Sequence, residues 1–542
     1  MKEVGVSYSM VARIKLSKIK SNEFIKHNFL IIGYCLLTLG FFYLFRIYTH
    51  KVNLASPVIS LVASTVYCLI FSGLRCQDTS KLLSIVTCFL SLVCVGYIFF
   101  SYPVFIPSTS EITTFTIEIY FYISIFAGIT AIWRPVFALI PFVYIPVVKS
   151  TMYQYTGIAI SETDYAVIVE TGAFSVFGMS LFWLFGKIYE HFKIDFLKTL
   201  VQIDKKVIGD IVIYLLIAVH FSNYYYAGYA KLVLDGPIFS WLYNDTYNIL
   251  YQSIVLKTMP FQHIPWMVSS VGWGLENFNF IGNVLVLLFQ ITAPLALLHR
   301  NTIIFYTVFY DLLHISIFIA TGIFFWKWIF LNTILLFSIK NLHFRRPKFP
   351  IFVMAFILCL LAPKVFYIPK LGWYDSREGN LTYFEAILTD GKVIKLPTNY
   401  FRNYSITFAQ HRVFKSAMRH KSIYCYGATH SWEQYKNSYD CKNSNTRLIR
   451  SDKLREKRLT KLDKFIKQYH HFTLLLSDQN NFHYNYFPHH IWSNPFMFKE
   501  DKLDISAIKA YRYVVEGYCI KNLKKGSFDI NKSVLDSQMI FI

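Results

Sequence analysis

The chain has 542 residues, of which 54% are hydrophobic, 18% are aromatic and only 16% are charged. This composition excludes an ordinary soluble protein, because soluble proteins carry more charge and fewer apolar side chains. The formal net charge of +22 does not indicate nucleic-acid binding, since the sequence contains no nucleic-acid-binding motif. Basic loops beside anionic membrane lipid and a basic tail explain the charge better.

Residues 1–27 form a basic segment that includes Lys2, Arg13 and Lys26. The apolar stretch that follows is long enough for a full span and has no small-residue cleavage pattern, so we expect a retained cytoplasmic segment. Further apolar stretches recur as far as residue 367 and predict a polytopic α-helical membrane protein of about eleven spans. The predicted spans are 28–48, 54–74, 82–103, 114–133, 135–148, 172–190, 208–232, 279–298, 302–321, 323–339 and 349–367.

The distribution of basic residues predicts the orientation of these spans. The loops 187–207 and 340–348 are rich in lysine and arginine, whereas 104–113 and 150–171 contain neither. Basic loops tend to stay in the cytoplasm. The N-terminus is therefore expected inside, and the chain after residue 368 outside. The stretch 135–148 is short, so it is expected either to span or to re-enter the membrane.

Residues 368–542 contain no spanning stretch and predict one strand-rich extracytoplasmic soluble domain. In "FEAILTDGKVIKLP", apolar strands flank Asp390-Gly391, a dipeptide typical of a hairpin turn. The residues 451–469 have the apolar spacing of a helix, and 510–520 have the pattern of a strand. In an oxidising compartment, Cys425 and Cys441 could form a disulfide, which leaves one tail cysteine over.

The predicted helix 208–232 carries an unusual lysine near its end. His220, Tyr224, Ala227 and Lys231 are spaced by four, three and four residues, so they share one face. Ala227 and Gly228 remove bulk one turn earlier and allow a close neighbour. Lys231 could extend to the membrane interface. Alternatively, an amine held away from water could take a proton from a hydroxyl of a lipid-soluble substrate.

The sequence here resembles a known family. Tyr226, Ala227, Gly228, Lys231 and Leu232 match the signature of the vitamin K-dependent γ-carboxylase and its bacterial relatives, which share a horizontally transferred transmembrane (HTTM) domain. The resemblance implies that Lys231 is the base that deprotonates vitamin K hydroquinone, or menaquinol. Oxygen addition then gives a strong base, which removes a proton from a glutamate side chain, and carbon dioxide adds to the carbanion. The resemblance also implies an HTTM-like domain over 28–367 and a lumenal domain rich in β structure.

Weaker matches follow downstream. His314 precedes Gly322 by eight residues, where the family has about ten; 287–298 and 257–267 resemble neighbouring family segments. Two departures are clear. The stretch 160–170 lacks the histidine of the family's Asn-Asn-His motif, and Ala230 stands where the carboxylase has a second lysine.

Other polar residues extend the predicted site. Asp311 and His314 lie on one helix face, either as a proton-handling pair in the cavity of Lys231 or as a hydrogen-bonded pair that joins helices. Glu276, in the outer segment 236–278, is a candidate for lining a substrate mouth, and Trp266 and Trp273 suit the membrane interface. The tail histidines lack the convergent spacing of a metal site, so no metal is expected.

Together these observations predict an integral membrane enzyme, possessing carbon-carbon lyase or ligase chemistry dependent on hydroquinone and O2, in the bacterial inner membrane. Lys231 and His314 are the expected catalytic residues. The expected substrate contacts are His220, Tyr224, Tyr226, Gly228, Asp311 and Glu276. The expected partners of the enzyme are membrane lipid and a secreted peptide or protein. The alternative is a non-carboxylating HTTM protein that matures a secreted peptide or gives immunity to it. A transporter is a weaker alternative, because no matching halves with interrupted helices are visible.

Overall fold

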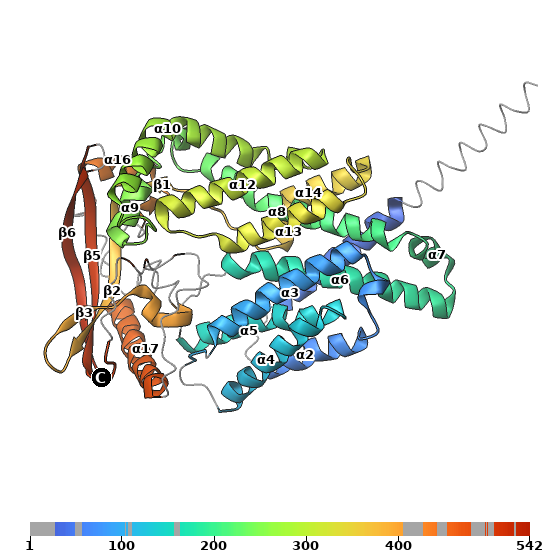
Figure 1. Cartoon of the computed structure of the whole chain (residues 1–542), viewed down its shortest axis with the longest axis horizontal. Coiled ribbons are helices and arrows are strands. Elements are labelled where there is room, and N and C mark those ends of the chain that lie inside the picture. The colour runs from blue at the N-terminus through green and yellow to red at the C-terminus, as the bar shows by residue number, and fades with distance from the viewer. Residues whose placement is uncertain are drawn as a thin grey trace, which may run out of the picture.

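The structure is a computed structural model. It describes residues 28–48, 57–102, 104–106, 111–156, 163–404, 426–441, 452–478, 491, 494, 496, 503–524 and 527–542. The predicted basic segment 1–27 lies outside the described residues, as does Cys425. Helices make up most of the described chain, and a strand-containing region follows them toward the C-terminus (Figure 1).

Eight helices in the described part of the chain are long and apolar enough to cross a membrane. They are Asn28–Tyr48, α3 (Lys81–Ser101), α4 (Glu111–Thr130), the combined helix Pro135–Thr156 that ends with α5 (Leu139–Thr156), α6 (Thr163–Phe192), α8 (Lys205–Leu232), α10 (Pro265–Ile291) and α12 (Arg300–Thr321). Three shorter helices coincide with the other predicted spans: α2 (Pro57–Ile70), α13 (Trp326–Asn341) and α14 (Phe349–Val365).

Several predicted boundaries are wrong. The stretch predicted over 135–148 continues to Thr156, because the helix passes through Pro146 without ending. The span predicted over 279–298 begins at Pro265, so Trp266, Trp273 and Glu276 belong to α10 rather than to a loop. The predicted loop 150–171 contains the end of α5 and the beginning of α6. Proline at the first helical position favours the early beginning of α10, since its missing N–H needs no partner there.

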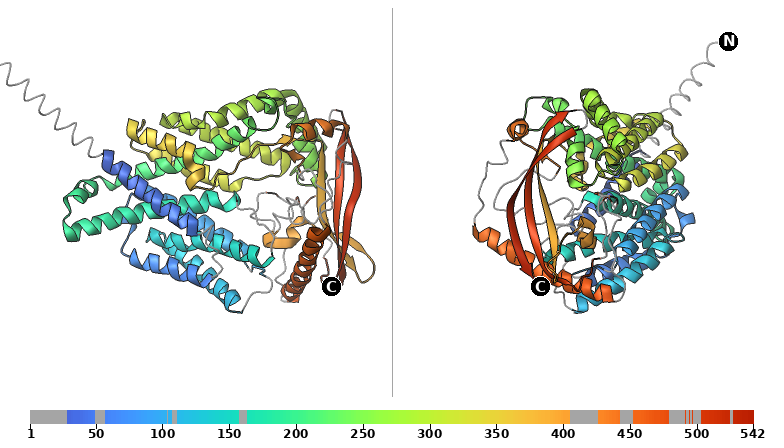
Figure 2. Two further views of the ribbon diagram at one scale, coloured as in Figure 1. Left: turned by 180° about the vertical axis from the view of Figure 1, so that it is seen from behind. Right: turned by 60° about the vertical axis from the view of Figure 1, so that its left-hand side comes forward.

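The two ends of the helix bundle differ in sequence and in neighbours. The two basic loops lie at the same end, where the His343 N–H donates to Asp210 Oδ2 over 3.0 Å and the Arg300 N–H donates to the Arg345 carbonyl over 3.0 Å. The short helix α7 (Asp195–Val201) also lies at this end, and the sheet lies at the opposite end (Figures 1 and 2). Short elements at the sheet end include α9 (Asn248–Leu256) and the 3-10 helix η3 (Ser240–Tyr243).

The sheet has four antiparallel strands in the order β3-β2-β5-β6. Their bounds are β2 (Glu378–Leu388), β3 (Val393–Lys395), β5 (Ile508–Lys524) and β6 (Ser527–Phe541). The predicted hairpin is confirmed: Ile387 pairs with Val393, and Gly391 has a positive φ of 87° in the turn. The predicted strand 510–520 lies within β5, and the predicted helix 451–469 is extended as α17 (Asp452–Asp478).

The strand-containing region packs directly onto the helices. Phe105 follows α3, and its carbonyl accepts a hydrogen bond from the Tyr404 hydroxyl over 3.0 Å. Its ring lies 5.3 Å from Tyr469 and 5.0 Å from Phe472 of α17. One cluster of buried apolar side chains continues from the spanning helices into the sheet and α17. The two parts therefore share a hydrophobic core.

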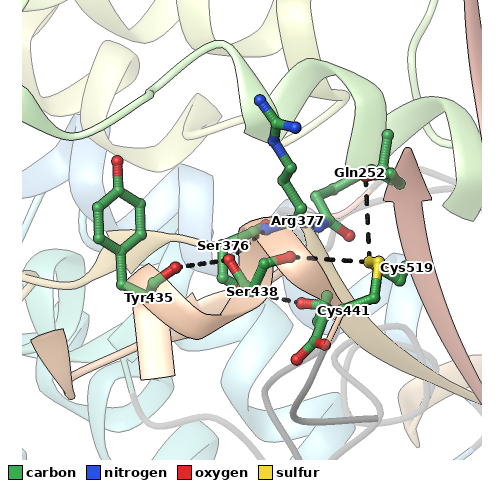
Figure 3. Close-up of a disulfide and its surroundings, with 9 residues drawn as sticks. Gln252, Ser376, Arg377, Tyr435, Ser438, Cys441 and Cys519 are labelled. Carbon is green, nitrogen blue, oxygen red and sulfur yellow. Dashed lines mark hydrogen bonds between the residues drawn. A yellow bond between two sulfur atoms is a disulfide. The ribbon is translucent and has the colours of Figure 1, made fainter. Parts of the chain in front are cut away.

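A disulfide joins Cys441 to Cys519 of β5, across 78 residues of sequence (Figure 3). The predicted alternative, in which Cys441 pairs with Cys425, is therefore wrong. Cys441 follows η5 (Ser438–Asp440), whose Ser438 hydroxyl accepts a hydrogen bond from the Arg377 N–H over 3.2 Å. This contact, close to the beginning of β2, holds Cys441 beside the sheet. Strand pairing then brings Cys519 opposite Glu378, next to it.

Candidate functional site

The candidate site is organised along α8. Its N-terminus is capped by Asp204, whose Oδ1 accepts from the Lys206 N–H over 2.9 Å. From Ile208 to Tyr224 every residue of α8 is buried. A helix that is buried on all sides lies in the centre of a bundle. Each polar side chain in this part of α8 therefore contacts other parts of the protein.

The first polar cluster lies in the spanning region and joins α8, α12 and α13. His220 Nε2 and Asn332 Oδ1 are 2.5 Å apart. The Asn332 amide donates to Asp311 Oδ1 over 2.7 Å and to the Tyr224 hydroxyl over 3.2 Å. Asn332 thus connects three of the predicted site residues. Asp311 hydrogen-bonds to Asn332, and the described residues show no hydrogen bond from it to His314, its expected partner.

Aromatic rings surround this cluster. Tyr224 stacks on Tyr310 with 3.5 Å between ring centroids and 8° between ring planes. The His314 ring lies 5.8 Å from Tyr224 and 5.9 Å from Trp328. The Nδ1 atoms of His220 and His314 are buried without a hydrogen-bond partner among the described residues.

Lys231 forms a second centre at the sheet end of α8. Its Nζ donates to the Ala227 carbonyl over 3.1 Å, to Gln290 Oε1 over 3.1 Å and to the Leu371 carbonyl over 2.9 Å. Nζ also lies 5.0 Å from the centroid of the Trp241 ring. Three oxygen acceptors match the three N–H donors of an ammonium. The side chain is directed at other parts of the protein, and does not extend freely toward solvent.

Two glycines make the approach to Lys231 possible. A Cβ atom at Gly228 would lie 2.8 Å from Gln290 Cβ and 3.1 Å from the Ile291 backbone nitrogen, so α8 and α10 are in close contact here. A Cβ atom at Gly372 would lie 2.5 Å from the Ala230 carbonyl carbon and 2.8 Å from the Lys231 nitrogen. The chain after α14 therefore touches the backbone of α8 at the lysine itself. Gly228 matches the predicted role of small residues in helix packing.

A buried carboxyl group lies close to this second centre. Asp375 Oδ2 accepts from the Asn244 amide over 2.7 Å, and Oδ1 accepts from Trp373 Nε1 over 3.0 Å. Burial raises the pKa of Asp375 to about 7, although these two donors and the charge of Lys231 oppose the increase. Asp375 is therefore a group that can exchange a proton near neutral pH, and its charge interacts with that of Lys231, although no hydrogen bond joins the two side chains among the described residues.

The remaining predicted residues have other positions. The Tyr226 hydroxyl donates to the Leu360 carbonyl of α14 over 2.5 Å, so it joins two helices. Glu276, on the N-terminal half of α10, accepts a hydrogen bond from the Tyr251 hydroxyl of α9. Neither residue has a hydrogen bond or ring contact with Lys231 or His314 among the described residues.

The two centres are separate. Tyr224 and Lys231 are seven residues apart on one helix, which corresponds to about 10 Å along its axis. No hydrogen bond or ring contact among the described residues joins Lys231 to His314. The helical spacing predicted one face for His220, Tyr224 and Lys231. His220 and Tyr224 both contact Asn332, whereas Lys231 has other partners. It gives no information about the direction in which the long lysine side chain turns.

Sequence reasoning missed Asn332 and Asp375. Asn332 had a usable signal, since a polar residue in a predicted span is unusual and needs a partner. Asp375 lies in the short strand β1 (Tyr374–Asp375), which pairs with β4 (Ala428–Thr429), and no local pattern indicates its burial. Among the tail histidines, His470 is buried and its Nδ1 lies 3.0 Å from the Tyr511 hydroxyl. The described residues contain no group of His, Cys, Asp and Glu that could hold a metal.

Comparisons with protein-family models, curated proteins and solved structures gave no match. The two centres along α8 are therefore interpreted from their own geometry and chemistry.

Proposed function

We propose that the protein is an integral membrane enzyme similar to the γ-carboxylase-like HTTM proteins, and that Lys231 handles the proton of a lipid-soluble quinol. The observation that carries this proposal is the inward direction of the Lys231 amine. It lies against the face of Trp241, beside an amide oxygen and near the buried Asp375. A lysine that served only as an interfacial anchor would direct its amine to water.

Proton transfer from Lys231 needs a second group, because its three acceptors suit the ammonium. Asp375 fits this role, since its pKa of about 7 allows it to be neutral or charged near physiological pH. In the proposed resting state Lys231 and Asp375 are both charged, and transfer of a proton from the ammonium to the carboxylate frees the lone pair of the amine. Gln290 and the Leu371 carbonyl then keep the amine in position.

The groups around Lys231 have the chemical character that binding of an aromatic diol requires. The Trp241 face offers stacking, while the amine and the Gln290 amide offer hydrogen bonds to a hydroxyl. Three cavities lined by described residues lie elsewhere and do not include Lys231. When bound, a quinol with O2 would supply the strong base that glutamate carboxylation requires. The protein's residues would orient the hydroxyl and accept its proton.

The second candidate is a non-carboxylating HTTM protein that acts in maturation of, or immunity to, a secreted peptide. One observation favours it. The stretch 160–170, in which the carboxylase has its additional histidine, contributes Glu170, and this carboxylate accepts from the Tyr367 N–H over 2.7 Å. Its Oε1 also lies 3.6 Å from Arg46 Nε. Glu170 thus joins three segments of the chain, which is a structural role.

We further propose eleven spans in a bacterial inner membrane, with α2, α13 and α14 crossing as short helices by local thinning of the bilayer. The N-terminus would be cytoplasmic and the chain after residue 368 outside. The disulfide supports this orientation, because disulfides persist in oxidising compartments. Protease added to intact cells should then degrade the tail; cleavage that requires permeabilised cells would reverse the orientation.

The test of function is Lys231→Arg, with Lys364→Arg as the control. Lys364 is an exposed lysine in the last turn of α14, just before the chain segment that contacts Lys231. Arginine keeps the charge but does not release its proton, so a proton-handling role predicts a loss on the order of 100-fold. The assay is incorporation of labelled CO2 into a glutamate-rich peptide with menaquinol and O2, on protein shown to be folded by its melting temperature.

Outcomes separate the two candidates. Labelling by the parent that Lys231→Arg abolishes and Lys364→Arg preserves supports the enzyme. If Lys231→Arg labels the peptide as well as Lys364→Arg and the parent do, Lys231 takes no part in the reaction. If the folded parent gives no labelling with either menaquinol or vitamin K hydroquinone, the non-carboxylating candidate is preferred.

A further inference from the structure

A cavity of about 640 Å³ lies between α4 and α17, at the sheet end of the helix bundle. It belongs to neither centre on α8. Thr114, Ile117 and Glu118 of α4 form one wall, and the floor is lined by Tyr102, Val104, Phe105 and Ile106. The opposite wall comes from α17, through Lys467, Gln468, His471, Phe472 and Leu475. The volume is in the range of sites that hold small organic molecules.

The interior of the cavity is mostly apolar. Ile117 in the α4 wall and Phe105 in the floor are buried, each with 7% of its surface exposed. The Phe105 and Phe472 rings lie 5.0 Å apart, so the floor is in contact with the α17 wall. Leu475 lines the cavity and remains 49% exposed. Such a surface suits a hydrocarbon chain.

The walls carry opposite charges. Glu118 lies on the α4 wall, and its carboxylate accepts from the Tyr102 hydroxyl over 3.2 Å. Lys467 and His471 lie one helical turn apart on the α17 wall, where Lys467 Nζ is 3.1 Å from Asp463. A carboxylate on a spanning helix is costly without a cationic partner. Among the described residues Glu118 forms no ion pair, and the Tyr102 hydroxyl is neutral and cannot take that role.

The cavity borders the lipid-facing side of α4. Ile112 is 71% exposed, Phe115 64% and Tyr122 58%, and exposed apolar side chains on a spanning helix face hydrocarbon. Thr114 and Glu118 are also exposed and lie beside this stripe. A membrane lipid can therefore reach the cavity laterally from the bilayer.

We propose that this cavity binds a zwitterionic phospholipid with a primary ammonium in its headgroup. One acyl chain lies on the apolar floor, the phosphate lies near Lys467 and His471, and the ammonium lies near Glu118. An anionic phospholipid satisfies the basic wall but leaves Glu118 without a cation. A neutral glyceride satisfies neither wall. The bound lipid would fill the junction between the helices and α17.

The experiment measures which lipids the full-length protein retains. Detergent-purified protein is incubated with phosphatidylethanolamine, phosphatidylglycerol or diacylglycerol of identical chains, and bound lipid is quantified by native mass spectrometry. The parent should retain phosphatidylethanolamine best and diacylglycerol least. Glu118→Gln should reduce the preference for phosphatidylethanolamine over phosphatidylglycerol by about fivefold, the contribution of one partly exposed ion pair.

Two further variants separate the walls. Lys467→Gln should weaken retention of both phospholipids, whereas Lys461→Gln, an exposed position on α17 outside the cavity, should not. Leu475→Trp should reduce retention of every lipid by filling the cavity, with the melting temperature as the check on folding.

Three results would overturn the proposal. They are equal retention of the two phospholipids by the parent, an unchanged preference in Glu118→Gln, and displacement of all lipid by an apolar peptide. The last result would assign the cavity to a peptide instead.

Discussion

Removal of the Cys441–Cys519 disulfide should strongly destabilise the tail. The change is Cys441→Ala together with Cys519→Ala, which leaves no unpaired sulfur at this site. The link closes 78 residues of chain. In the chain-entropy model, a loop of this length corresponds to a stabilisation of about 4.5 kcal/mol, through restriction of the unfolded state. Because Cys519 is buried beside Ser438, the loss of packing adds to this effect.

The assay is pulse proteolysis of detergent-solubilised protein in increasing urea, with fragments assigned by mass to the tail or to the helices. Cys359→Ala is the control, because Cys359 is a free and fully buried cysteine in α14. A reductant should lower the stability of the parent tail and leave that of the double variant unchanged. If the parent and the double variant unfold at the same urea concentration, or if peptide mapping links Cys441 to Cys425, the reasoning fails.

Three further changes test other parts of the structure. Gly372→Ala should destabilise the protein by about 2 kcal/mol or more, because its Cβ would overlap backbone atoms of α8, whereas Gly274→Ala, with open space around it, should be neutral; melting temperatures compare them. Asp375 has a folded-state pKa raised from 3.8 to about 7, so the unfolded chain releases a proton that the folded protein keeps. Stability should therefore fall by up to about 4 kcal/mol between pH 4 and 7 and then level off, and Asp375→Asn should remove this slope in a pH series of melting temperatures; an equal slope in both proteins would contradict the assignment. Asn332→Leu removes the hydrogen bonds to two buried partners and should lower the unfolding free energy by about 1–3 kcal/mol, measured by urea titration; no change would show that the cluster adds nothing to stability.

Hydropathy predicted the helices well because it depends on local composition alone. Local composition also predicts tight turns, but it does not predict contacts between segments that are far apart in the sequence. Asp390-Gly391 fixes a hairpin turn within a few residues, so the pairing of β2 with β3 was predictable. Cys519 pairs with Cys441 because β5 lies beside β2, and this neighbourhood depends on strand order over more than a hundred residues.

The candidate site was predictable only in part, for the same reason. The helical period placed His220 and Tyr224 on one face, and both contact Asn332. The neighbours of Lys231 are different: Gln290, Leu371 and Asp375 come from α10 and from the chain after α14. Their arrival depends on two glycine contacts. The small residue Gly228 indicated a close neighbour but not which segment supplies it, and no local signal indicated the contact at Gly372. The α10 boundary was missed because Pro265 reads equally as a loop residue or as the first residue of a helix.

The strand order β3-β2-β5-β6 has a consequence for biosynthesis. Strand β2 leaves the ribosome well before its central partner β5: Ala510 pairs with Ile387, so more than 120 residues separate them. At 5–20 residues per second, this delay is on the order of 6–24 seconds. Throughout that interval one edge of β2 has no strand to pair with and is open to wrong partners. This segment is therefore a suitable binding site for a translocation-associated chaperone. A chain released by a ribosome that stalls between β2 and β5 would be prone to aggregation.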